Sequence, residues 1–164
     1  MPETDGPAIE LRPVSPADRD LLFRIYAGTR TEEMALLDWP EAAIEAFLRQ
    51  QFEAQDTHYR GNYPGASFDV IVVGGQPAGR LYLHLGADET RIIDIALLAD
   101  FRGLGVGTRL LGQVMDSAGA RGASVTIHVE RNNPALRWYR RLGFQLAEDK
   151  GVYLFLRWSP APAP

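Results

Sequence analysis

The sequence predicts a mixed α/β (α+β) fold, and three observations indicate it. Several short runs alternate apolar and polar residues with the period of two that strands have. Other runs place apolar residues three and four positions apart, as amphipathic helices do. In the second half of the chain one such helix stands between two strands, an order that makes the strands parallel through a right-handed crossover. The 164 residues, 46% of them hydrophobic, suffice for one domain with a buried core.

The first part of the chain is predicted to contain one strand followed by helices. We expect a strand over residues 8–14, a helix from about 16 to 27, a short helix over 31–37, a longer helix from about 40 to 57 and an irregular loop over 58–66. Ser15, Pro16 and Asp18 suit the cap and first turn of the first helix. Asp38 is expected to cap the longer helix.

The remaining residues are predicted to form an antiparallel meander, the crossover and a final hairpin. Strands are expected over residues 67–73, 76–85, 91–98, 123–130, 143–149 and 151–158, with the crossover helix over 108–118. Asn133 and Pro134 suit the cap and first position of a short helix that Gly143 ends. The ends of the chain, residues 1–7 and 159–164, are expected to be flexible tails.

Composition and charge exclude several classes of function. The formal net charge is −4 and the basic residues are mostly scattered, so nucleic acid is not expected as a partner. No apolar run approaches the roughly 20 residues of a membrane span, and the acidic start does not resemble a signal peptide, so we expect a cytoplasmic protein without membrane contact. The chain has no cysteine, and no histidine or carboxylate cluster has metal-ligand spacing, so no metal is expected.

A loop of alternating glycines, DFRGLGVGTRLL at residues 100–111, connects a predicted strand to the crossover helix. Such a loop leaves backbone N–H groups at the positive end of the helix dipole, which is an arrangement that binds phosphate. An ordinary tight turn would carry the same glycines. The loop is not a Walker loop, because no Lys-Ser/Thr pair follows, and it is not the dinucleotide fingerprint, whose third glycine stands three positions after the second.

Two motifs in order resemble one known family. RGLGVG at residues 102–107 fits arginine or glutamine, any two residues, glycine, any residue, then glycine or alanine. Further along, VERNNPALRWYRRLGF contains an Asn-x-x-Ala segment at Asn132 and a tyrosine, Tyr139, before Gly-Phe. Together they resemble the coenzyme A loop and the following segment of the GNAT superfamily of N-acetyltransferases, over about residues 67–158.

The resemblance implies one acetyltransferase domain over residues 1–164 and a GNAT-like fold. This fold has a mixed, mostly antiparallel central sheet of about six or seven strands, with helices on both faces. It also implies acetyl-CoA as co-substrate, with its pyrophosphate on the backbone amides of the glycine loop. The cofactor-binding residues expected from it are Leu97, Leu98, Arg102, Gly103, Leu104, Gly105, Val106, Gly107, Thr108, Asn132 and Ala135.

Proton transfer needs an acid for the departing thiolate and a base for the amine. Tyr139 is the candidate acid, because a phenol can protonate a thiolate if it is well aimed, although a core tyrosine would show the same spacing. Asp94 is the candidate base, as a lone carboxylate in an otherwise apolar strand, and the alternative is a salt bridge to Arg91 or Arg80. The rival bases are Glu130, His128 and His84.

The sequence therefore predicts an acetyl-CoA-dependent N-acetyltransferase that moves an acetyl group to a primary amine by direct attack in a ternary complex. The acceptor is a small-molecule or peptide amine, which Glu32, Glu33 and Asp38 could attract. One alternative is a non-catalytic acyl-CoA-binding or interaction protein on the same fold, and another is a nucleotide-phosphate-binding module. A homodimer is a further expectation, because the final hairpin offers a strand edge.

Overall fold

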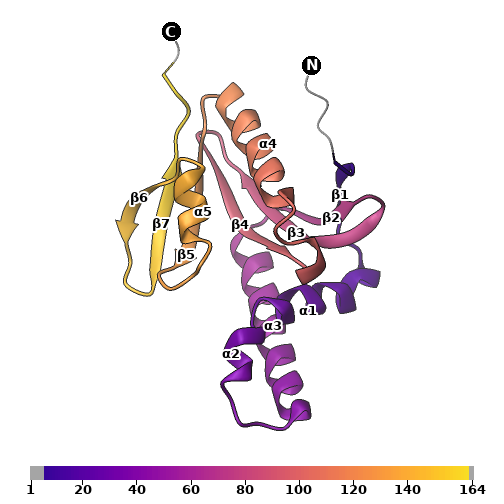
Figure 1. The fold of residues 1–164 in the computed structure, drawn as a ribbon. Helices are drawn as coiled ribbons and strands as arrows, with labels where there is room; N and C mark the ends of the chain where they lie inside the picture. The colour runs from indigo at the N-terminus through magenta and orange to yellow at the C-terminus, as the bar shows by residue number, and fades with distance from the viewer. Residues whose placement is uncertain (1–5, 163–164) are drawn as a thin grey trace. The chain divides into compact units, whose positions relative to one another are not determined.

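A computed structural model describes residues 6–162, which form a mixed sheet with helices (Figure 1). The elements are β1 (Ile9–Pro13), η1 (Pro16–Asp18), α1 (Arg19–Gly28), α2 (Thr31–Ala35), α3 (Glu41–Asn62), β2 (Ser67–Val73), β3 (Gln76–Leu85), β4 (Glu89–Leu97), η2 (Ala99–Phe101), α4 (Val106–Ala120), β5 (Ser124–Glu130), α5 (Leu136–Arg141), β6 (Gln145–Asp149) and β7 (Tyr153–Trp158). The seven strands follow the order β1-β2-β3-β4-β5-β7-β6. β4 and β5 are the one parallel pair of this sheet, so the predicted fold class is confirmed.

The chain divides into two compact units. The N-terminal unit is Met1–Tyr82 with Asp94–Leu104, and the C-terminal unit is Leu83–Ile93 with Gly105–Pro164. The expectation of a single domain stays a prediction. The predicted tails, residues 1–7 and 159–164, lie partly outside the described residues, and residues 159–162 have no regular secondary structure. In the part of the chain that the structure describes, none of the helices combines the length and apolar character needed to span a membrane.

Apolar side chains of α1 and α3 form the core of the N-terminal unit with two strands. These side chains are buried and pack against one another. They are Leu21, Leu22, Phe23, Ile25, Tyr26, Leu48 and Phe52, with Val70 of β2 and Ala96 of β4. Burial of large apolar side chains is the main stabilising contribution to such a core, at roughly 1.5–3 kcal/mol for each. This core fixes the helices next to the end of β4, where the glycine loop begins.

The helical segment begins at Pro16, as Ser15, Pro16 and Asp18 predicted, but its first turn is the 3-10 helix η1 and α1 begins at Arg19. The Asp18 carboxylate accepts hydrogen bonds from Arg12 Nη1 at 2.8 Å and Nη2 at 2.9 Å, and from Ser15 N at 2.8 Å. The hydrogen bonds from Arg12 and Ser15 hold the pKa of Asp18 well below its usual range. Asp18 therefore ties β1 to the first turn of the helical segment.

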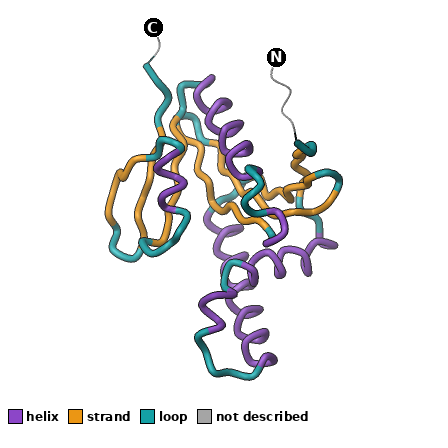
Figure 2. The backbone as a smooth tube through the Cα atoms, in the orientation of Figure 1, coloured by secondary structure: helices purple, strands orange, loops and turns teal. Residues whose placement is uncertain are grey.

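The longer helix differs from its prediction at both ends. Asp38 does not cap it, because its N-cap is Pro40. At the other end α3 continues to Asn62, so residues 58–62 of the predicted loop are helical and only residues 63–66 lie outside regular structure (Figure 2). Gly61 and the aromatic residues favoured a loop by propensity, but propensity is a weak guide where tertiary contacts hold the turn. One such contact is the hydrogen bond from Tyr59 to β4 described below.

A glycine allows β3 and β4 to approach closely in the N-terminal unit. A Cβ atom on Gly79 would lie 2.2 Å from the carbonyl oxygen of Ala96 and 3.0 Å from Leu97 Cα. No side chain fits there, so glycine is required at this position. The close approach shapes the end of β4 that precedes the glycine loop.

In the C-terminal unit α4 packs on β5, and β7 lies between β5 and β6. Residues Glu89–Ile92 of β4 pair with Ser124–Ile127 of β5. β6 is the outer strand, all five of its residues are exposed, and its pairing with β7 shifts between Leu146 and Glu148. Such a bulge disfavours pairing with a further strand. The expected homodimer stays a prediction.

Candidate active site

The turn predicted to bind phosphate, residues 103–108, is open. Gly103 and Gly105 have φ angles of 73° and 80°, in the left-handed region that glycine adopts without strain. A Cβ on either glycine would meet no atom within 4 Å. The first backbone bond of α4 runs from Arg109 N to Gly105 O at 3.0 Å, which leaves the amides of residues 106–108 without a partner in the preceding turn. These amides can donate to an anionic ligand.

Arg102 binds backbone carbonyls within the N-terminal unit. Its Nε donates to Leu97 O at 2.9 Å, and its Nη2 donates to Gly28 O at 3.2 Å. The sequence predicted Arg102 only as a cofactor-binding residue, and neither carbonyl was foreseen. These bonds hold the start of the glycine loop to the end of β4 and the end of α1. A phosphate contact of Arg102 stays a prediction.

The end of β4 presents one backbone amide away from β3. Leu98 N donates to Ala78 O of β3 at 2.7 Å, and Leu98 O accepts from Phe101 N at 3.0 Å. Successive residues of a strand direct their N–H groups to opposite edges, so the Leu97 N–H points away from β3. Both leucines are half-buried, and Leu98 packs against the core of the N-terminal unit. Of the two predicted residues, Leu97 therefore offers the amide suited to a bound acyl chain.

The two asparagines after β5 differ in their contacts. Asn133 Oδ1 accepts a hydrogen bond from Ala135 N at 2.9 Å, but Asn133 is not the N-cap that the sequence predicted. Asn132 is exposed and makes no hydrogen bond to another described residue, so its amide is available to a ligand. The helix begins later than predicted, because Ala135 is the N-cap and α5 starts at Leu136.

Tyr139 is held by aromatic packing on α5. Its side chain is buried, with 5% of the residue exposed. Its ring centroid lies 4.9 Å from that of Trp138 and 5.7 Å from that of Phe144. A fixed phenol is what a general acid needs, and it is also what a core tyrosine has. The catalytic role of Tyr139 stays a prediction.

One contact at the glycine loop was not foreseen from the sequence. Trp138 of α5 donates from Nε1 to Thr108 Oγ1 at 2.9 Å, which joins α5 to the first turn of α4. The sequence pattern alone indicates no partner for this tryptophan. Its position next to Tyr139 could have drawn attention to Trp138. Its partner Thr108 lies 30 positions away in the sequence, so only the folded structure identifies it.

Asp94 forms the ion pair with Arg80 that the sequence offered as the alternative to catalysis. Asp94 Oδ2 accepts from Arg80 Nη2 at 2.8 Å and from Tyr59 Oη at 2.9 Å. Arg80 Nη2 also donates to Gln55 Oε1 at 2.8 Å. Burial would lower the pKa of Arg80, but the charge of Asp94, together with the neighbouring Tyr82 and Tyr59 and the hydrogen bond to Asp94, raises that pKa above its usual value.

Both Asp94 contacts end on the same oxygen. The other oxygen, Oδ1, accepts no hydrogen bond from any residue that the structure describes. Next to this ion pair Arg80 Nε and the Tyr82 hydroxyl are buried without a hydrogen-bond partner among the described residues, and burial raises the pKa of Tyr82. Asp94 therefore keeps one oxygen for a further partner, and its role as base stays a prediction.

The rival base His128 lies among cations in the C-terminal unit. Its Nε2 is 3.1 Å from Lys150 Nζ and its Nδ1 is 3.5 Å from Arg91 Nη1. Partial burial and these two positive charges lower the pKa of His128. Its ring also stacks on Phe155 with centroids 4.8 Å apart. Both nitrogens thus face cationic groups, and a role of His128 as base stays a prediction.

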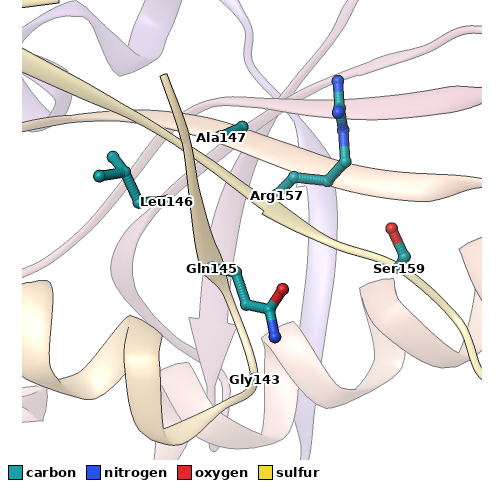
Figure 3. Close-up of a pocket in the computed structure, with 6 residues that line it drawn as sticks. All are labelled: Gly143, Gln145, Leu146, Ala147, Arg157 and Ser159. Atoms are coloured by element: carbon teal, nitrogen blue, oxygen red, sulfur yellow. The ribbon is translucent and has the colours of Figure 1, made fainter. Parts of the chain in front are cut away.

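A shallow pocket of about 270 Å³ lies at the β6–β7 hairpin (Figure 3). Its lining residues are Gly143, Gln145, Leu146, Ala147, Arg157 and Ser159. None of the predicted site residues lines it. The candidate site is therefore defined by the glycine loop and the residues that contact it.

The model of the acetyltransferase (GNAT) family matches residues 29–144, which include the glycine loop and Tyr139. The chain belongs to the GNAT acetyltransferase family. A solved structure with the same fold is the PaiA N-acetyltransferase of Thermoplasma acidophilum in complex with coenzyme A. It has a TM-score of 0.69 and 18% identity and covers 93% of this chain and 99% of that one.

Two curated relatives of this GNAT chain match over part of their length. An uncharacterized protein of Mycobacterium leprae is 32% identical over 107 residues, which are 65% of this chain and 27% of that protein. N-alpha-acetyltransferase 50 of Danio rerio is 33% identical over 75 residues, which are 44% of each chain. The matches thus span less than half the length of these relatives.

The predicted site residues of this GNAT chain fall into both compact units. The N-terminal unit holds Asp94, Leu97, Leu98, Arg102, Gly103 and Leu104. The C-terminal unit holds Gly105, Val106, Gly107, Thr108, Asn132, Ala135 and Tyr139. Within the C-terminal unit the structure brings the helix of Tyr139 against Thr108 through Trp138.

Proposed function

We propose that this chain is an acetyl-CoA-dependent N-acetyltransferase that transfers the acetyl group directly to a primary amine. The observation that carries the proposal is the open glycine turn at the start of α4, where three amides have no backbone partner among the described residues, in a chain of the GNAT family. In the Thermoplasma relative of the same fold, coenzyme A is the bound molecule. The chain offers no cysteine for a covalent intermediate, which agrees with direct attack.

The residues of the turn fit a diphosphate. Both left-handed glycines leave space within 4 Å, and the amides of residues 106–108 add the positive end of a 15-residue helix. Asn132 would add a side-chain amide, and the Leu97 N–H would hold the acyl chain or the carbonyl oxygen as it gains charge. Acetyl-CoA, when bound, supplies the thioester carbonyl that the amine attacks.

The protein supplies the proton transfers. The Tyr139 hydroxyl donates a proton to the leaving sulfur as the carbon–sulfur bond breaks, while its ring is held between Trp138 and Phe144. Asp94 Oδ1 accepts the proton that the amine nitrogen releases as the carbon–nitrogen bond forms. Arg80 and Tyr59 hold the carboxylate by its other oxygen.

The acceptor is an amine of a small molecule or a peptide. Glu32 and Glu33 are exposed in the first turn of α2, and Asp38 and Trp39 follow it. A cationic amine would be attracted by these carboxylates. The name of the Danio relative, N-alpha-acetyltransferase 50, supports a peptide amine as one class of acceptor.

A Tyr139→Phe variant separates the enzyme from a non-catalytic acyl-CoA-binding protein. The ring packing is kept, so affinity for acetyl-CoA in calorimetry should stay within about twofold. The rate of thiol release with an amine panel should fall by about 10²-fold, because the acid for the thiolate is lost. Binding without turnover in the unmodified protein would instead support the binding protein. Unchanged turnover in the variant would remove Tyr139 from the mechanism.

A further inference from the structure

Trp138 makes two contacts with the first turn of α4, and both involve residues of the candidate phosphate site. Its indole Nε1 donates to Thr108 Oγ1 at 2.9 Å. A Cβ on Gly107 would lie 3.2 Å from Trp138 Cη2 and from Cζ2, so the indole lies directly against this glycine. The side chain thus contacts two of the three residues whose amides lack a partner.

The same indole is next to Tyr139. The two ring centroids are 4.9 Å apart, and Tyr139 is buried while Trp138 is only half-buried. α5 has six residues, too few for a helix that is stable by itself, so tertiary contacts must set its position. Trp138, which is next to Tyr139 in α5, provides such a contact with the first turn of α4.

The Thr108 hydroxyl is used by this contact. Thr108 is exposed, and the bond to Trp138 fixes its side chain while its backbone amide stays unpaired within the turn. The glycine at position 107 allows the approach, because a larger residue would push the indole away. The first turn of α4 and the helix of Tyr139 are therefore held by one small contact, formed by Gly107, Thr108 and Trp138.

We propose that Trp138 is a positioning residue that fixes the first turn of α4 to the helix carrying Tyr139. Binding of the coenzyme A diphosphate at the turn and proton donation by Tyr139 then depend on the same contact. This inference rests on the proposed function and extends it, because it assigns a role to a residue outside the family motif.

Three variants change the hydrogen bond between Trp138 and Thr108 and so test the proposed contact. Trp138→Phe keeps a ring against Gly107 and removes the N–H donor, Thr108→Val removes the acceptor, and Thr108→Ser keeps it. We expect Trp138→Phe and Thr108→Val each to raise the Kd for coenzyme A and to lower kcat by about 3- to 10-fold. The double variant should show an effect no larger than that of the more impaired single variant, and Thr108→Ser, which restores the acceptor, should recover most of the Kd and kcat lost in Thr108→Val.

Trp158→Phe is the matched control. Trp158 also lies against a glycine of the C-terminal unit, since a Cβ on Gly143 would be 3.3 Å from its Cδ1. This variant should lower the Tm without changing the Kd or kcat beyond about twofold. Thr108 is exposed, so Thr108→Val gives the result even where Trp138→Phe folds poorly.

Two results would overturn the inference alone. One is that the unmodified protein binds coenzyme A and both single variants keep its Kd and kcat. The other is that the effects of the two variants add, as for independent sites. Failure of the unmodified protein to bind coenzyme A would overturn the proposed function and the inference with it.

Discussion

At the scale of the residue, neighbouring atoms leave little or no space for a side chain at Gly79 and Gly107. The Ala96 carbonyl faces Gly79, and the Trp138 indole faces Gly107. The atom that faces Gly79 belongs to the backbone, so displacing it would cost considerable free energy. The atoms that face Gly107 belong to one side chain, which can shift more easily. Both positions lie next to the residues proposed to hold acetyl-CoA.

A Gly79→Ala variant should lower the free energy of unfolding by about 1–3 kcal/mol, because its Cβ would overlap the Ala96 carbonyl. Gly61→Ala is the matched control, since a Cβ at Gly61 of α3 meets no atom within 4 Å. That control should stabilise the protein by about 0.5 kcal/mol by restricting the unfolded chain. Urea denaturation of both variants measures the difference. Equal effects of the two substitutions would contradict the close approach of β3 and β4.

Side-chain partners show what the sequence can and cannot specify. The sequence predicted Asn133 as the helix cap, but its side chain accepts from Ala135 N before the helix and the N-cap is Ala135 itself. The sequence offered Arg91 or Arg80 as the partner of Asp94, and the choice of Arg80 needed the fold. Arg91 instead pairs with Glu89, two residues before it on the same strand.

At the scale of the element, helix starts depend on local chemistry and helix ends depend on packing. The start of the helical segment at η1 was predicted, because the bonds of Asp18 join residues close in sequence. The end of α3 was not, because Tyr59 reaches β4 across 35 positions of the chain. Periodicity and propensity do not contain such a contact.

An Asp18→Asn variant should lower the free energy of unfolding by about 2 kcal/mol near neutral pH, because charged hydrogen bonds to Arg12 and Ser15 are lost. The folded pKa of Asp18 lies below its unfolded value, so this stabilisation is present above about pH 4 and is lost as the pH falls through the folded pKa. The difference between variant and unmodified protein should therefore shrink from pH 5 to pH 2.

Asp20→Asn is the control for this experiment. Asp20 is exposed in the first turn of the same helix, so its substitution should change the free energy of unfolding by less than about 0.5 kcal/mol. Denaturation curves at several pH values report both variants. A difference for Asp18→Asn that does not depend on pH would contradict the role of its charge.

At the scale of the whole molecule, most of the sheet was predictable and the two compact units were not. The strand–helix–strand order predicted the parallel pair of β4 and β5, and the structure has it. β7 lies between β5 and β6, and its apolar residues Leu154 and Leu156 are buried, whereas all five residues of the outer strand β6 are exposed. The division into units depends on contacts between distant segments, which no local pattern contains.

The glycine loop connects these scales. Its glycines set the turn, its helix supplies the amides, and family membership indicates the ligand class. The central claim is that this turn binds the diphosphate of acetyl-CoA.

Thermal unfolding in the presence of acetyl-CoA, coenzyme A and ATP tests this claim most directly. At a concentration of about 100 times the Kd, a ligand specific for the folded state adds about 2.7 kcal/mol, which is roughly 5–10 °C in Tm for a chain of this size. We predict that acetyl-CoA and coenzyme A raise the Tm by this amount and that ATP raises it less. No shift with millimolar acetyl-CoA, or a larger shift with ATP, would contradict the assignment.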